Sequence, residues 1–288
     1  MEAIDIENLL LNNDEKAKHF AKENLNETNE HREKCLEEIR KWLTEDQAKL
    51  HARMEDQYLL PFLRGCKYNM EKTKKKLVNY YTMRRNVPEW FQNRNPELKE
   101  IQDLMKLGVF VPLTKLQDNK LVVIVRTAIH DPCIHTQDNV FKTGNMMMDV
   151  ASLENIIPAQ IYGVIAIFDL YGMDFDHAKE FTPSMIKKAV FCWQNYHVRP
   201  KNLEFINAPP TINVILSIFK SFMSEKLKNR IKVHTDGYEK LYEVVSKDIL
   251  PPEYGGHGET MEELIKYWNG VLLKYKTWFL DDEMYKSD

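Results

Sequence analysis

The N-terminal third of the chain places apolar positions at the spacing of amphipathic helices. Residues 30–43 show this most clearly, because four apolar side chains fall on one helical face: Cys35, Leu36, Ile39 and Leu43. The same spacing predicts helices over residues 14–24 and 58–63, and a longer helix that Asn69 caps and Pro88 ends. We therefore expect an all-helical N-terminal region.

Beyond Gly108 the pattern changes to continuous apolar runs rich in β-branched residues, which suit strands covered on both faces. Four such runs predict strands, over residues 121–125, 161–170, 203–206 and 231–233. Helical patterns separate and follow them, over residues 137–155, 182–196, 211–224 and 238–245. This alternation predicts an α/β fold with a mostly parallel sheet, followed by an apolar helical tail over residues 261–279.

The helix predicted over residues 211–224 is unusually apolar. Its polar side chains form one narrow stripe: Asn213, Ser217, Lys220 and Ser224. The remaining apolar arc is much wider than the roughly 100° that a surface helix needs. Two interpretations stay open, a deeply buried core helix or a helix that faces an apolar cavity or lipid as well as the core. Basic residues follow directly, as a membrane-surface site requires.

Composition and charge narrow the class of protein. The 288 residues are 43% hydrophobic and 29% charged, which is typical of a globular protein and excludes a disordered, collagen-like or coiled-coil chain. The net charge of −3 argues against a general nucleic-acid binder. The acidic N-terminus does not resemble a signal peptide, and no apolar run reaches membrane-spanning length. Four scattered cysteines suit reduced thiols, so we expect a cytosolic protein.

Candidate catalytic and metal-binding residues are few. No phosphate-binding loop, dinucleotide-binding glycine motif or serine nucleophile elbow occurs. His130, Cys133 and His135 are residue types that bind zinc, but no second ligand pair accompanies them, and we favour a turn over a metal site. Asp169 stands near the end of an apolar strand, where we favour a hydrogen-bonding role over a catalytic one.

A basic run lies on the helix that Asn69 caps. It consists of Lys72, Lys74, Lys75 and Lys76. A run of like charges on one helix is usually a solvated face, and we favour that interpretation over an interaction patch.

Five segments follow one another in an order that is informative as a set. They are residues 58–68 (YLLPFLRGCKY), 168–172 (FDLYG), 207–210 (NAPP), 222–231 (FMSEKLKNRI) and 250–256 (LPPEYGG). Together they resemble the motifs of the CRAL-TRIO lipid-binding family, over about residues 56–258. Within that family the chain is most similar to the branch of tocopherol and retinaldehyde carriers.

The resemblance implies an α/β CRAL-TRIO fold with a mobile gate helix. It divides the chain into an N-terminal helical domain (1–95), a lipid-binding domain (96–258) and a C-terminal helix (259–288). One hydrophobic molecule would sit between the sheet and the gate helix, residues 211–224, in an apolar pocket of roughly several hundred Å³. The positions carried over to this pocket are Met146, Val150, Val164, Phe168, Leu203, Ile212, Leu216 and Phe219.

The resemblance also implies a site for phosphoinositide headgroups. In tocopherol carriers basic residues form this site, and the matching positions are basic here: Arg199, Lys201, Lys226 and Arg230. Two departures stand out. Cys66 replaces a family arginine, so one basic contact is missing or passes to Lys67. Met146 and Val150 replace hydroxyl-bearing residues, so a phenolic ligand would lose polar partners, at a cost of about 1–3 kcal/mol.

These observations lead to a carrier of one hydrophobic ligand, tocopherol-like, a retinoid, a carotenoid fragment or another lipid. We expect no enzymatic activity, no metal, no cofactor other than the ligand, and no nucleic-acid partner. We expect a cytoplasmic monomer that associates transiently with phosphoinositide-containing membranes. A phosphoinositide sensor that regulates a protein partner is the alternative. An enzyme that uses Asp169 or His130 for acid–base chemistry is a third hypothesis.

Overall fold

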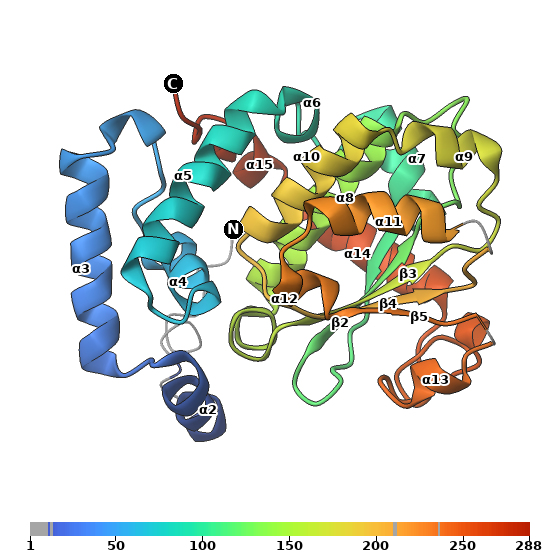
Figure 1. The fold of residues 1–288 in the computed structure, drawn as a ribbon, viewed down its shortest axis with the longest axis horizontal. Coiled ribbons are helices and arrows are strands. Elements are labelled where there is room, and N and C mark those ends of the chain that lie inside the picture. The colour runs from blue at the N-terminus through green and yellow to red at the C-terminus, as the bar shows by residue number, and fades with distance from the viewer. Residues whose placement is uncertain (1–10, 12–13, 210–211, 236) are drawn as a thin grey trace.

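A bundle of helices and a helix-covered sheet make up the part of the chain that the structure, a computed structural model, describes (Figure 1). That part comprises residues 11, 14–209, 212–235 and 237–288. The first ten residues therefore lie outside it, as do Pro210 and Thr211 at the start of the predicted helix over residues 211–224. Among the described residues, none of the helices has the length and apolar character needed to cross a membrane.

The bundle occupies the left side of Figure 1 and is helical throughout, as the sequence predicts. Its elements are α2 (Glu15–Leu25), α3 (Asn29–Glu45), η1 (Ala48–Leu50), α4 (Asp56–Gly65), α5 (Met70–Asn86) and α6 (Pro88–Phe91). Side-chain caps begin several of them. The side-chain oxygen Oδ1 of Asn69 accepts a hydrogen bond from the Lys72 backbone amide at 2.9 Å, which confirms the predicted cap of α5. The helix α7 (Lys99–Leu107) leads from the bundle to the sheet.

The sheet has five strands in the order β1-β2-β3-β4-β5. Their bounds are β1 (Phe110–Pro112), β2 (Leu121–Arg126), β3 (Val164–Asp169), β4 (Pro200–Ile206) and β5 (Ile231–Val233). The pairs from β2 to β5 are parallel, and one row of the register joins Val123, Ala166, Leu203 and Ile231. Only the edge strand β1 is antiparallel to its neighbour among the described strands. The predicted mostly parallel sheet is therefore confirmed.

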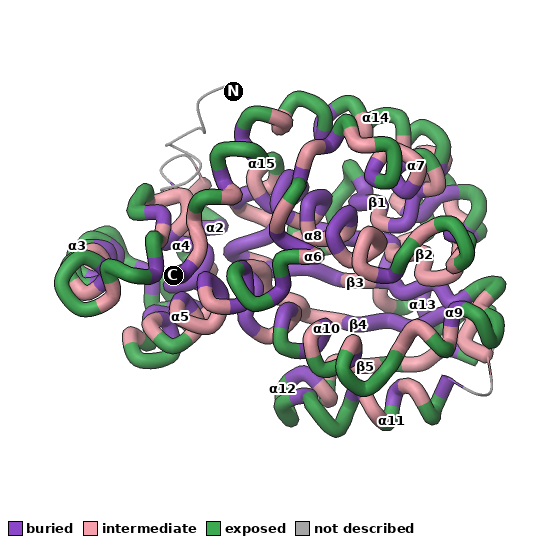
Figure 2. The backbone as a smooth tube through the Cα atoms, turned by 90° about the horizontal axis from the view of Figure 1, so that it is seen from above, coloured by how far each residue is buried: buried purple, intermediate pink, exposed green. Residues whose placement is uncertain are grey.

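Helices cover both faces of the sheet. In Figure 1, α8 (Gln137–Glu154), α10 (Pro183–Asn195) and α11 (Ile212–Phe222) lie above it, with α9 (Phe175–Glu180) at one end. The remaining elements are η2 (Ile157–Tyr162), α12 (Glu225–Lys228), α13 (Glu239–Tyr242), η3 (Pro252–Tyr254), α14 (Met261–Lys274) and α15 (Lys276–Asp282). Figure 2 shows that buried residues follow the strands and the inner sides of these helices.

The sequence prediction differs from the structure at several elements. The strand predicted over residues 161–170 begins only at Val164, because residues 157–162 form a π-helical turn that ends at Gly163. Gly163 has a φ of +102°, and a Cβ atom there would lie 2.6 Å from the Arg199 carbonyl oxygen. The strand β1 and the helices α6, α7 and α9 were not predicted, and the helix predicted over residues 238–245 is reduced to α13.

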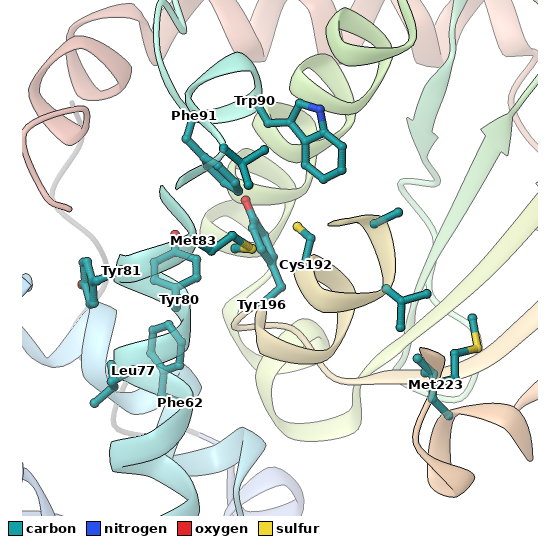
Figure 3. Packing of buried hydrophobic residues seen from close by; sticks show 14 of the residues in the cluster. Phe62, Leu77, Tyr80, Tyr81, Met83, Trp90, Phe91, Cys192, Tyr196 and Met223 are labelled. Carbon is teal, nitrogen blue, oxygen red and sulfur yellow. The ribbon is translucent and has the colours of Figure 1, made fainter. Parts of the chain in front are cut away.

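The bundle packs on the sheet domain through an aromatic layer and a buried ionic cluster. The rings of Tyr80 on α5 and Tyr196 after α10 lie 5.7 Å apart between centroids (Figure 3). Nearby, Asp282 at the end of α15 accepts from Arg53 at 2.8 Å and pairs with Arg84 at 2.7 Å and with Arg94. The C-terminal helix thereby ties the bundle to the sheet domain.

Candidate functional site

An apolar cavity lies between the sheet and the helices above it. Its volume is about 180 Å³, smaller than the roughly several hundred Å³ that the family resemblance implies for the pocket. Alternate strand residues form its floor, among them Val123, Ala166 and Phe205, because every second side chain of a strand points to the same face. The helices α8, α10 and α11 form its walls and roof.

Aromatic rings follow one another around this cavity. Phe205 stacks on Phe168 with 4.7 Å between centroids, and Phe168 lies 5.7 Å from Trp193. Trp193 in turn stacks on Phe219 of α11 at 5.5 Å, and Phe219 lies 6.1 Å from Phe181. These side chains offer a large apolar surface to a bound molecule, and their contacts bind α11 to α10.

Six of the eight positions that the resemblance implies for the pocket line this cavity. They are Val164, Phe168, Leu203, Ile212, Leu216 and Phe219. Met146 and Val150 do not line it, because they lie on the opposite side of α8 in the core that packs against α14. The α8 residues that face the cavity include Gly144 and Met148, two positions earlier in the helix. These residues also lack hydroxyl groups, so the expected loss of polar partners for a phenol applies to them instead.

The helix α11 has two different apolar faces. Ile212, Leu216 and Phe219 are buried over the cavity. On the outer side, Val214 is 66% exposed and Phe222 is 38% exposed. The predicted polar stripe of Asn213, Ser217, Lys220 and Ser224 is exposed along its length. The interpretation of a helix that faces a cavity as well as the outside therefore describes α11 better than a deeply buried core helix.

A second, basic pocket of about 420 Å³ lies beside the apolar cavity. It brings together all four residues that the resemblance implies for headgroup binding: Arg199, Lys201, Lys226 and Arg230. Four lysines complete its charged lining: Lys67, Lys72, Lys75 and Lys76. No aspartate or glutamate lines the pocket in the described part of the chain. Such a concentration of uncompensated cations favours a ligand with several negative charges.

Burial and mutual repulsion lower the pKa values of these cations. Burial, followed by repulsion from Arg230, lowers the pKa of Arg199 to about 10. Burial, with the charges of Arg199 and Arg230, lowers the pKa of Lys201 to about 8. Burial is also the main cause that lowers the pKa of Lys226. An anion bound among these side chains would relieve the repulsion and hold all of them in the charged form.

The lysines of the bundle are partly a solvated face and partly the wall of the basic pocket. Lys72 and Lys75 are exposed, as the interpretation of a solvated face predicts, and they also line the pocket together with the half-buried Lys76. Lys74 is half-buried and pairs with Glu38 at 2.9 Å. Sequence periodicity could not distinguish these lysines, because the opposite wall of the pocket comes from residues more than a hundred positions later in the chain.

The two cavities share a wall. Four residues border both of them: Trp193, Val198, Pro200 and Leu227. The ring of Trp193 also stacks on Phe219, which roofs the apolar cavity. A ligand in one cavity is therefore separated from a ligand in the other by single side chains.

Asp169 is a hydrogen-bonding centre, as the sequence interpretation favours. Its Oδ1 accepts from the Asn207 side-chain amide at 2.7 Å and from the Tyr171 backbone amide at 3.0 Å. Its Oδ2 accepts from the Tyr254 hydroxyl at 2.9 Å. Three of the five resembling segments therefore meet at this carboxylate and fix the chain just before α11.

The residues considered for a metal form a turn. The Asp131 carboxylate accepts from the Cys133 amide at 2.8 Å, and the Asp131 carbonyl accepts from the His135 amide at 2.8 Å. Cys133 points to solvent, whereas His130 is buried, and burial lowers its pKa to about 4. Among the described residues no three potential ligands are arranged to hold a metal ion.

Comparison with known proteins places this fold in a class. The family model of the CRAL/TRIO domain matches residues 106–256, and that of the Pinta-like UBA domain matches residues 28–101. Because the first of these covers more than half of the chain, the chain belongs to the CRAL/TRIO domain family, whose members bind hydrophobic small molecules and lipids.

Particular relatives agree with this assignment. The alpha-tocopherol transfer protein-like protein of Homo sapiens is 29% identical over 258 residues, which are 88% of this chain and 73% of the relative. Clavesin-2 of Rattus norvegicus is 24% identical over 238 residues, 82% of this chain and 71% of the relative. The crystal structure of Sfh5 superposes with a TM-score of 0.57 at 15% identity, covering 90% of this chain and 98% of that chain.

Proposed function

We propose that this protein is a carrier that holds one hydrophobic small molecule, tocopherol-like or a retinoid, and exchanges it at membranes that contain phosphoinositides. The observation that carries the proposal is the wall shared by the apolar cavity and the basic pocket. A headgroup held in the basic pocket would bring a membrane surface directly beside α11. The similarity to alpha-tocopherol transfer protein-like proteins supports a role in transfer.

Exchange would require α11 to move away from the sheet. Its inner apolar residues would then leave the cavity, and its outer residues Val214 and Phe222 are already exposed apolar groups that suit a lipid surface. Further apolar side chains are exposed near α9, where Phe175 is 80% exposed and Tyr171 is 78% exposed. These residues would stabilise the open helix at a bilayer, so α11 acts as a gate.

No bond of the ligand is made or broken in this mechanism. The chain would work in the cytoplasm, bind membranes peripherally and transiently, and release the ligand where a phosphoinositide engages Arg199, Lys201, Lys226 and Arg230. The bundle lysines Lys67, Lys72, Lys75 and Lys76 would face the same headgroup from the other wall.

Charge reversal in the basic pocket tests this division of roles. The double substitution Lys226→Glu and Arg230→Glu should slow transfer of a fluorescent tocopherol to phosphoinositide-containing vesicles at least about tenfold, because each cation near an anionic leaflet contributes about 1 kcal/mol. The affinity for the fluorescent tocopherol should change less than about twofold, since neither residue lines the apolar cavity.

The matched control reverses two exposed lysines elsewhere, Lys106 on α7 and Lys266 on α14, and should transfer like the unaltered protein. A pocket variant that loses ligand affinity and transfer in equal measure would contradict the proposed roles. Headgroup binding without any transfer by the unaltered protein would favour the alternative, a phosphoinositide sensor that regulates a partner.

A further inference from the structure

Asn145 is a polar residue in an otherwise apolar part of the cavity lining. It lies on α8 between the cavity-facing residues Gly144 and Met148, and opposite Cys192 and Tyr196 at the end of α10. The predicted pocket did not include this position. The Tyr196 hydroxyl donates to the Asp149 carboxylate on the same helix and also lies 3.3 Å from the Asn145 backbone carbonyl, so it joins the end of α10 to α8 at this point.

The side-chain amide of Asn145 is half satisfied. Its Oδ1 accepts a hydrogen bond from the Cys192 thiol, with 3.8 Å between sulfur and oxygen. Its Nδ2 is buried, and no acceptor among the described residues pairs with it. Of the side-chain nitrogen and oxygen atoms in the described cavity lining, this nitrogen is the one that is buried without a partner.

The chemistry of Cys192 supports this orientation of the amide. Burial raises the pKa of the Cys192 thiol, so the sulfur keeps its proton and acts as a donor. A thiol donor requires the amide oxygen on its side, which leaves the NH₂ group on the other. The terminal torsion of an asparagine is soft, so this group can turn toward an acceptor in the cavity.

Two other polar side chains of the lining already have hydrogen-bond partners. The Thr127 hydroxyl donates to the Asp169 carbonyl at 2.8 Å, and the Arg126 guanidinium donates to the Leu107 carbonyl at 3.1 Å. An oxygen atom of a molecule bound in the cavity would give the Asn145 amide the acceptor that it lacks.

We infer that Asn145 donates a hydrogen bond to an oxygen of the bound ligand, so that the cavity selects an apolar molecule bearing a carbonyl, hydroxyl or ether oxygen over a hydrocarbon of the same shape. This inference rests on the proposed function, because it requires a ligand in the apolar cavity. The oxygen would lie against α8 and α10, and the apolar remainder of the ligand would lie beneath α11. Asn145 is then a specificity-determining residue.

A matched pair of probes tests the inference on the full chain. The probes are all-trans-retinal and the hydrocarbon with the same polyene, in which a methyl group replaces the aldehyde. Binding is followed by quenching of tryptophan fluorescence, since Trp193 lines the cavity. The unaltered protein should bind retinal at least about tenfold more tightly than the hydrocarbon, because an unpaired buried donor is expensive.

The substitution Asn145→Leu, which keeps the volume of the side chain, should bring this ratio close to one by weakening retinal binding. The control Met148→Leu alters the same wall of the cavity without changing a donor, and should keep the ratio. Without ligand, the Asn145→Leu protein should resist urea at least as well as the unaltered protein, because the substitution removes an unpaired donor.

The outcomes separate the inference from the function on which it rests. Equal affinity of the unaltered protein for the two probes, or an unchanged ratio in Asn145→Leu, would overturn the inference and leave the carrier function standing. A loss of urea resistance in ligand-free Asn145→Leu beyond that of Met148→Leu would assign the amide a structural role and overturn it as well. Failure of the unaltered protein to bind the two probes and the fluorescent tocopherol would overturn both proposals.

Discussion

Burial of the cations in the basic pocket, followed by their mutual repulsion, lowers the pKa values of individual residues. Lys201 shows it best, because burial and the charges of Arg199 and Arg230 lower its pKa to about 8. No carboxylate in the described lining of the pocket compensates these charges. Lys201 therefore loses its proton as the pH rises through about 8.

The first prediction concerns this titration. A bound polyphosphate raises the pKa of Lys201, so binding takes up a proton and its affinity falls as pH rises through about 8. The affinity for soluble inositol trisphosphate, measured by calorimetry, should fall about fivefold between pH 7 and pH 9 if one cation contributes about 1 kcal/mol.

Substitution of Lys201 by arginine provides the control, because a guanidinium keeps its charge over this range. The Lys201→Arg protein should show a smaller pH dependence and a smaller proton uptake than the unaltered protein. A fall of the same size in both proteins would show that Lys201 does not carry the effect.

The residues of the two pockets show how much of the site could be predicted from the sequence. The four cations of the resembling motifs do lie around one pocket, and six of eight predicted cavity positions do line the cavity. The resemblance placed Met146 and Val150 in the pocket, but they face the core that packs against α14. Because α8 is apolar on two sides, its sequence does not reveal which side faces the cavity. The sequence could not indicate Asn145, because only the folded structure shows that its side-chain NH₂ group is buried without an acceptor.

The helix α11 is the element on which the proposed exchange depends. It is short, its inner face roofs the cavity, and its outer face exposes apolar side chains. The inner apolar face of such a helix can pack over the cavity, and its outer apolar side chains can contact a bilayer. The chain just before it is fixed by the hydrogen bonds of Asn207 and Tyr254 to Asp169.

The second prediction places one charge on the outer face of α11. Val214→Asp should slow transfer of the fluorescent tocopherol about tenfold, because contact of this side chain with lipid would contribute about 1.5 kcal/mol or more. Ligand affinity should not change, since Val214 does not line the cavity.

The control Ser217→Asp adds the same residue to the exposed polar stripe of the same helix. It carries the same cost in helix propensity, so it separates membrane contact from helix stability. Equal slowing by the two substitutions would contradict membrane contact through the outer apolar face.

The strands β2, β4 and β5 and the helices α8 and α10 lie close to their predicted bounds. The strand β1 was not predicted, because it ends at Pro112 and depends on pairing with β2. The π-helical turn η2 was mistaken for part of β3, because its apolar residues give no sign of where extended backbone begins.

At the scale of the whole molecule, the C-terminal helix α15 joins the two parts of the chain. Asp282 is buried, and its pKa is held well below the ordinary range by Arg84, Arg94 and Arg53, despite the opposing effect of burial. Arg53 and Arg84 belong to the bundle side of this cluster. Because all these groups are buried, removal of one charge leaves the others without compensation.

The third prediction follows from this cluster. Asp282→Asn should lower the free energy of unfolding by about 3–5 kcal/mol, as breaking a buried ionic network does. The neighbouring Asp281 is exposed, so Asp281→Asn should change it by less than about 0.5 kcal/mol. Urea unfolding of the two proteins measures both values.

The same carboxylate gives a pH dependence of stability. Since the pKa of Asp282 is lower in the folded state than in the unfolded state, its contribution is complete above about pH 4 and is lost as the pH falls below that value. Between pH 5 and pH 2 the free energy of unfolding should therefore fall more steeply with falling pH for the unaltered protein than for Asp282→Asn. Parallel curves would show that Asp282 does not anchor the bundle.

The central claim is that the apolar cavity holds one hydrophobic molecule taken from a membrane. Native mass spectrometry of the protein after incubation with membrane-lipid vesicles tests it most directly. The account predicts one adduct per chain, identified after solvent extraction as a single apolar molecule that bears oxygen. Ala166→Phe, which fills the cavity from the floor of the sheet, should abolish the adduct. A protein that remains free of adducts, or an adduct that Ala166→Phe retains in full, would contradict the account.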